Sequence, residues 1–151
     1  IQDRVEAAIY AVTKQRTRVT ASGRTDAGVH AMGQVASCDV NCGLPVDVMQ
    51  RAINANLPAD IRVLRIDDSL PGFHAIRDAH SKRYRYVIQD GGVLDVFAQH
   101  YCWFVPQELN QQLMSAAGQL LVGTRDFASF QAAGSPRRYG GHVLSAGRSP
   151  R

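Results

Sequence analysis

Residues Ala21–Ala31 read Ala-Ser-Gly-Arg-Thr-Asp-Ala-Gly-Val-His-Ala and lie between two apolar segments. Gly23 and Gly28 can adopt backbone angles that side chains disfavour, so the chain can turn sharply here and approach a ligand closely. Arg24 and Asp26 then lie two residues apart on an irregular loop, the kind of segment where binding and catalytic groups concentrate. We expect the rest of the chain to be organised around this loop.

The segments on both sides of the loop have the pattern of strands. Thr17–Ala21 is short and rich in β-branched residues, and Val35–Val40 follows the loop. The loop is therefore predicted to connect two paired or neighbouring strands. Upstream, apolar residues recur at helical spacing, which predicts an amphipathic helix over residues 1–15.

The later segments continue a mixed pattern of helices and strands. Leu44-Pro45 predicts the start of a second helix, which Pro58 ends. The further expected elements are three strands and a helix whose leucines face the core: Ile61–Ile66, Ser81–Gln89, Tyr101–Val105 and Pro106–Val122. This order predicts an α+β domain with a mainly antiparallel sheet and helices packed on one face. Residues 134–151 are predicted to form a poorly ordered basic tail.

The composition is that of an ordinary globular chain. Its 151 residues suit one domain, with 45% hydrophobic and 20% charged residues. No run of about 18 apolar residues appears, so no transmembrane span is expected. The formal net charge of +4 permits nucleic-acid binding without requiring it. Three cysteines argue for a reducing compartment, and Cys38 and Cys42 lack a second Cys/His pair with which to bind zinc.

Two residues have both a structural and a functional interpretation. A carboxylate in a tight turn, such as Asp26, most often caps a backbone N–H, whereas the nearby Arg24 and the glycines favour a nucleophile or base. Tyr84 lies in a basic segment and is either a core residue or a flat face on which a base stacks. For Tyr86 we expect a core position. His30 and His74 are expected to be hydrogen-bonded scaffolding rather than acid–base groups.

Several motifs, in their order along the chain, resemble the TruA-type tRNA pseudouridine synthases. The most specific of them is Gly23-Arg24-Thr25-Asp26-Ala27-Gly28-Val29-His30-Ala31. The supporting motifs are Asn54-Ala55-Asn56-Leu57-Pro58, Phe73-His74-Ala75, Lys82-Arg83-Tyr84-Arg85-Tyr86 and Gly123-Thr124-Arg125-Asp126-Phe127-Ala128-Ser129-Phe130. The resemblance assigns residues 1–133 to the family's catalytic region.

The resemblance implies an enzyme that isomerises uridine to pseudouridine at positions 38–40 in the anticodon stem-loop of tRNA. It also implies a pseudouridine synthase-like fold, a cytoplasmic homodimer, and neither a cofactor nor a metal. Asp26 matches the catalytic aspartate, which attacks the nucleotide covalently. Tyr84 matches the tyrosine that stacks on the extruded base, and Arg24 matches the arginine that helps to hold it there.

The chain departs from the family pattern in four places. The family's first strand, and its second half with an arginine that pairs with the catalytic aspartate, are expected outside these residues. Ile76 stands where many members carry arginine, with Arg77 one place later, and the sequence after Ser135 drifts from the family's. We therefore expect an incomplete fold and an isolated chain that is weakly active or inactive. The alternative is a catalytically incomplete RNA-binding fragment.

Overall fold

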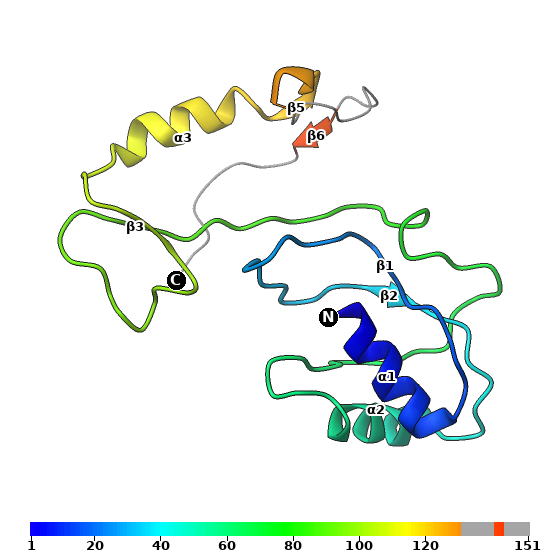
Figure 1. Ribbon diagram of the computed structural model, residues 1–151. Helices are drawn as coiled ribbons and strands as arrows, with labels where there is room; N and C mark the ends of the chain where they lie inside the picture. The colour runs from blue at the N-terminus through cyan, green and yellow to red at the C-terminus, as the bar shows by residue number, and fades with distance from the viewer. Residues whose placement is uncertain (131–140, 144–151) are drawn as a thin grey trace. The chain divides into compact units, whose positions relative to one another are not determined.

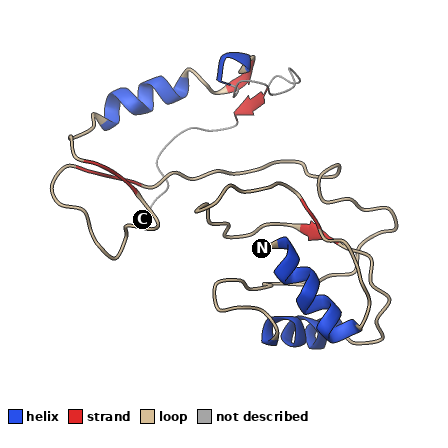
Figure 2. Cartoon of the chain, viewed as in Figure 1, coloured by secondary structure: helices blue, strands red, loops and turns tan. Residues whose placement is uncertain are grey.

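The computed structural model describes residues 1–130 and 141–143 (Figure 1). Its elements are α1 (Gln2–Thr13), β1 (Thr20–Ala21), β2 (Ala36–Ser37), α2 (Val46–Ala55), β3 (Ile88–Asp90), β4 (Trp103–Val105), α3 (Gln111–Gln119), β5 (Gly123–Arg125), η1 (Ala128–Phe130) and β6 (Gly141–Val143). The chain forms two compact units, Ile1–Arg85 and Tyr86–Arg151. In both units, loops and turns separate short elements (Figure 2).

The first unit contains the predicted pair of strands around the glycine-rich loop. β1 and β2 are antiparallel, with Thr20 opposite Ser37 and Ala21 opposite Ala36. Both strands are shorter than predicted, but the loop connects them as expected. This hairpin anchors both ends of the loop.

Helix α1 confirms the helix predicted over residues 1–15. It ends at Thr13 because Lys14 adopts a left-handed conformation, φ 59°, and donates its N–H to the carbonyl of Tyr10. Helix α2 confirms the second predicted helix, with Pro45 as its N-cap residue. Proline suits a helix start because its φ is already close to helical and an N–H is not needed there.

The core of this unit lies between the two helices. Its buried residues are Ala8, Ile9, Val19, Ile53 and Leu57. They come from one face of α1, from α2 and the residues that follow it, and from the segment before β1. Burying an aliphatic side chain contributes about 1.5–3 kcal/mol. The hairpin and the two helices are therefore held together by a small apolar centre.

The prediction of a strand over Ile61–Ile66 is wrong. The structure shows no strand there, because side chains of α2 occupy the backbone groups that a neighbouring strand would use. Asn54 bonds both the N–H and the carbonyl of Val63 at 2.8 Å. Gln50 Nε2 donates to the carbonyls of Val63 at 3.1 Å and Leu64 at 2.5 Å.

The strand predicted over Ser81–Gln89 is wrong for most of its length. Only its end forms β3, which pairs in parallel with β4. No strand in the described part of the chain pairs with residues 81–86, and Val87 contributes only its carbonyl, which accepts the N–H of Trp103 at 2.8 Å. Alternation predicts which side chains share a face, but a strand also needs a partner for its backbone groups.

Helix α3 confirms a helix within the range Pro106–Val122, but not its predicted burial. Asn110 caps its N-terminus, since the side-chain oxygen accepts the N–H of Leu113 at 2.9 Å. No residue of α3 is buried, and Leu113 is 68% exposed. Its apolar face therefore has no core to pack against among the described residues of its unit.

The predicted α+β class is confirmed only as a mixture of helices and short sheets. Residues 1–130 and 141–143 form three separate two-stranded sheets, of which β1–β2 and β5–β6 are antiparallel and β3–β4 is parallel. A single sheet with helices on one face is not present in this described part. The predicted tail over residues 134–151 lies outside the described residues, except for β6. No described helix is long and apolar enough to cross a membrane.

Candidate active site

The Asp26 loop, Gly23–Gln34, is closed at its base by two bonds beyond the β1–β2 pair. The N–H of Ser22 donates to the carbonyl of Val35 at 2.8 Å. Gln34 Nε2 donates to the carbonyl of Gly23 at 2.5 Å. The loop is thus a projection from the hairpin, with its two ends held side by side.

The two glycines of the loop have different roles. Gly28 adopts φ 83°, in the left-handed region that favours glycine, as the turn was expected to require. Gly23 does not have a positive φ. Its lack of a side chain instead leaves space for Lys82, because a methyl group added at Gly23 would lie 3.3 Å from Lys82 Nζ.

Asp26 is exposed within this loop. Its backbone carbonyl, not its carboxylate, accepts the N–H of Val29 at 3.2 Å. No residue in the range 1–130 forms a hydrogen bond or an ion pair with its side chain. The carboxylate is therefore not used as a turn cap, which was the structural alternative.

Arg24 is exposed as well, and it does not form an ion pair with Asp26. The two residues are close along the chain, but their side chains are not in direct contact, and the role expected for Asp26 stays a prediction. Two side chains that are two residues apart on an exposed loop are free to point different ways. Arg24 remains available to contact a bound anion.

Tyr84 lies outside the core, with 74% of its surface exposed. Of its two interpretations, the core position is therefore wrong for the structure described here. The core position expected for Tyr86 is also wrong, since that residue is 84% exposed. Residues 82–85 present a tyrosine among basic side chains, an arrangement that suits a base stacked on the ring and phosphates near the cations.

The Phe73-His74-Ala75 motif packs against the hairpin. Ala75 is 2% exposed and donates its N–H to Ser37 Oγ at 3.2 Å. His74 Nδ1 accepts the N–H groups of Ile76 at 3.2 Å and Arg77 at 3.3 Å. The scaffolding role expected for His74 is confirmed. That of His30, which is exposed in the loop, stays a prediction.

An ion pair completes this turn. Arg77 Nε lies 3.0 Å from Asp78 Oδ1, and the N–H of His74 donates to Asp78 Oδ2 at 2.8 Å. These contacts, the arginine bond first, lower the pKa of Asp78 below its ordinary value. Arg77 is therefore committed to a local contact. Ile76, where many relatives of the resembled family carry arginine, is 54% exposed.

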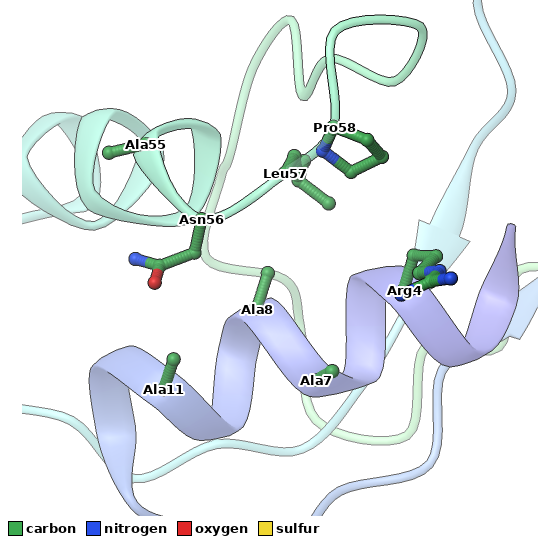
Figure 3. Close-up of a pocket in the computed structure, with 8 residues that line it drawn as sticks. All are labelled: Arg4, Ala7, Ala8, Ala11, Ala55, Asn56, Leu57 and Pro58. Atoms are coloured by element: carbon green, nitrogen blue, oxygen red, sulfur yellow. The ribbon is translucent and has the colours of Figure 1, made fainter.

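A separate pocket of about 400 Å³ lies between α1 and the end of α2 (Figure 3). It is lined by Arg4, Ala7, Ala8, Ala11, Ala55, Asn56, Leu57 and Pro58. None of the predicted site residues lines it. Within the described residues, no group of three or more His, Cys, Asp or Glu side chains could hold a metal ion.

Sequence reasoning missed the position of Lys82. Its ammonium group lies against the backbone of Gly23 and so connects the Asp26 loop with the segment that carries Tyr84. The available signal was a lysine two residues before the tyrosine. Spacing alone could not show that this lysine reaches a loop so far away in the sequence.

The exposed Asp26 carboxylate and the exposed Tyr84 in its basic segment are residue types suited to chemistry on a nucleotide. Residues 1–76 match the sequence model of the family described as tRNA pseudouridine synthase. The chain belongs to the tRNA pseudouridine synthase family.

Individual relatives agree with this assignment. The chain is 44% identical over 139 residues to tRNA pseudouridine synthase A of Moorella thermoacetica. The aligned region covers 92% of the chain and 56% of the relative. The chain is 43% identical over 138 residues to the Geobacter sulfurreducens protein of that name, covering 91% and 57%. The Bacillus subtilis protein is 42% identical over 135 residues, covering 88% and 55%. The chain spans about half the length of these curated relatives.

Proposed function

We propose that this chain contributes the nucleophile and the base-stacking group of an enzyme that converts uridine to pseudouridine at positions 38–40 of tRNA. The observation that carries the proposal is the Asp26 carboxylate, which is exposed and has no partner among the described residues. A carboxylate committed to a turn or an ion pair would first have to be released. Asp26 can meet a substrate directly.

The reaction is an isomerisation, so no co-reactant is needed. An Asp26 oxygen forms a covalent bond with the nucleotide, and the bond between N1 of uracil and C1′ of the ribose breaks. The uracil turns, a bond forms between its C5 and C1′, the aspartyl bond is released, and the proton on C5 is lost while N1 gains one. The product has the same composition as uridine, although the C5 hydrogen leaves to the solvent and N1 takes up a solvent proton.

Tyr84 and Arg24 act on the extruded nucleotide. Removing a base from a stem costs a few kcal/mol of stacking and pairing. A base stacked on an aromatic side chain regains about 1–3 kcal/mol. The exposed ring of Tyr84 offers such a face, and the unpaired guanidinium of Arg24 can hold a phosphate of the flipped nucleotide.

The test uses tritium release from tRNA labelled at C5 of uridine. Because the relatives are about twice as long, the chain is compared with a chimera in which its residues 1–130 replace the matching segment of the Moorella thermoacetica protein. We expect release by the chimera and little or none by the chain alone. Asp26→Asn should abolish release by the chimera, while Asp60→Asn, at another exposed carboxylate, should not. Full activity of the Asp26→Asn chimera would contradict the assignment.

A second candidate is RNA binding without turnover. It is favoured by the coverage of only about half of each relative, together with the exposed Tyr84. In that case both the chain and the chimera bind the tRNA anticodon stem-loop but release no tritium, and Asp26→Asn leaves the affinity unchanged. The same preparations therefore distinguish the two functions.

The homodimer is part of the proposal for the whole protein. Sedimentation of the chimera measures it directly, and a mass of two chains is expected. If the chimera has the mass of a single chain and is fully active, the homodimer is contradicted, while the catalytic role proposed for Asp26 still stands.

A further inference from the structure

The end of the Lys82 side chain lies next to Gly23. A methyl group at Gly23 would lie 3.3 Å from Nζ and 3.8 Å from Cε of Lys82. The end of the lysine side chain therefore lies against the backbone where the Asp26 loop begins. Both residues belong to the first unit, Ile1–Arg85, so the contact lies within one compact body.

The ammonium group at this position has no anionic partner in the structure. Among residues 1–130, no carboxylate forms an ion pair with Lys82, and no acceptor forms a hydrogen bond with it. Asp26 is no exception. An ammonium carries three hydrogen-bond donors, and none of them bonds to an acceptor among residues 1–130. It can therefore bind an external anion.

The neighbours of Lys82 identify the chemistry of that anion. Arg24 is exposed on the same loop, and Arg83 is exposed next in the chain. Tyr84, two residues on, exposes 74% of its surface. Cations beside an exposed ring match a polynucleotide, whose phosphates and bases alternate along one strand.

We propose that Lys82 is a substrate-binding residue that holds a backbone phosphate of the RNA at the entrance to the Asp26 loop. Gly23 serves this role by leaving the space that the lysine end occupies. The inference rests on the proposed function and adds a residue to that site. It also explains why a glycine without a positive φ stands at the start of the loop.

The experiment measures binding of an anticodon stem-loop RNA to the 151-residue chain as a function of salt concentration. Each phosphate neutralised by a cation contributes about 0.7–0.9 to the slope of log affinity against log salt. Lys82→Met should lower the magnitude of the slope by about that amount. Lys82→Arg should retain it, and Lys14→Met, at the chain's other lysine, should leave it unchanged.

The role of Gly23 is tested by a double-mutant cycle. Gly23→Ala should lower the slope in the original chain, because the lysine end has to shift to make room for the new methyl group. It should have no further effect on the slope when Lys82→Met is already present. An equal effect in both backgrounds would show that Gly23 acts on the loop itself, and would overturn the link.

The salt dependence of binding tests the role of Lys82 independently of catalytic turnover. Weaker binding by Lys82→Met with an unchanged salt slope would show that the lysine only supports the loop, and this would overturn the proposal. Lys82→Gln, which keeps a polar end, should give the same slope as Lys82→Met. In the chimera, Lys82→Met should raise KM more than it lowers kcat. If the chimera releases no tritium but the slope still changes, the proposed function fails and the phosphate contact stands.

Discussion

The side chain of Asn54 pairs with the backbone of Val63 in the way that a neighbouring strand would. Its Nδ2 donates to the carbonyl of Val63, and its Oδ1 accepts the N–H of Val63, both at 2.8 Å. The motif Asn54-Ala55-Asn56-Leu57-Pro58 therefore does more than end a helix. It attaches the following segment to α2 and so keeps Ile61 and Val63 against the core.

We expect Asn54→Ala to destabilise the chain by about 1–3 kcal/mol, because the part-buried N–H of Val63 loses its partner and the carbonyl of Val63 keeps only the bond from Gln50. Urea unfolding followed by circular dichroism measures the change. Asn56→Ala is the matched control, since Asn56 is exposed and makes one bond to the carbonyl of Ala52. Equal losses of unfolding free energy in the two variants would show that the bonds between Asn54 and Val63 add no stability beyond that of an exposed hydrogen bond.

The second prediction concerns how the small core between α1 and α2 contributes to stability. Leu57 is 8% exposed and Leu64 is 70% exposed, although both lie in the same stretch of chain. Leu57→Ala should cost about 2–5 kcal/mol of unfolding free energy, as truncation of a buried leucine does. Leu64→Ala should change it by less than about 0.5 kcal/mol. A similar loss in both variants would contradict the position of the core.

Glu6 should make stability depend on pH. The pKa of Glu6 is lowered, first by the hydrogen bond from Gln2 and then by the hydrogen bond from the N–H of Val19. The second bond connects α1 to the segment before β1. A carboxylate with a lowered pKa stabilises the fold above its unfolded pKa, and this contribution is lost as the pH falls through the folded value. The original chain should therefore lose stability on acidification below pH 4.5.

Glu6→Gln provides the comparison for this effect, because it cannot titrate. The stability difference between the two chains should shrink as the pH is lowered, while it stays constant at higher pH. A difference that is independent of pH would mean that the Glu6 contacts do not depend on its charge.

We expect RNA binding to require the aromatic ring of Tyr84 but not its hydroxyl group. Tyr84→Phe should retain affinity for the anticodon stem-loop, whereas Tyr84→Ala should lose about 1–3 kcal/mol of it, which is the contribution of one stacked base. Tyr10→Ala is the control, because Tyr10 is exposed but packs against Arg16. Fluorescence titration measures all three, and a loss in Tyr84→Phe equal to that in Tyr84→Ala would contradict stacking.

The sequence predicts well where neighbouring residues decide the structure. Helices α1 and α2 follow from apolar spacing and from Pro45, and the hairpin follows from β-branched segments around a glycine-rich loop. Each of these signals acts over a few residues. Local backbone preferences are therefore enough to place them.

The errors share a different cause. Ile61–Ile66 and residues 81–86 alternate as strands do, but strands form only when another segment takes up their backbone groups. For the first segment the partner is the side chain of Asn54, and for the second the described residues contain no partner strand. The burial predicted for α3 failed for the same reason, since an apolar face needs something to cover it.

By itself, the sequence determined the family, the helices of the first unit and the identity of Asp26, Arg24 and Tyr84 as site residues to test. It did so because motif order and local periodicity are properties of the chain as written. Only the tertiary structure decided that the Asp26 carboxylate is unpaired and that Lys82 meets Gly23. Those facts depend on which segments, far apart in the sequence, pack together, and no local sequence pattern encodes that packing.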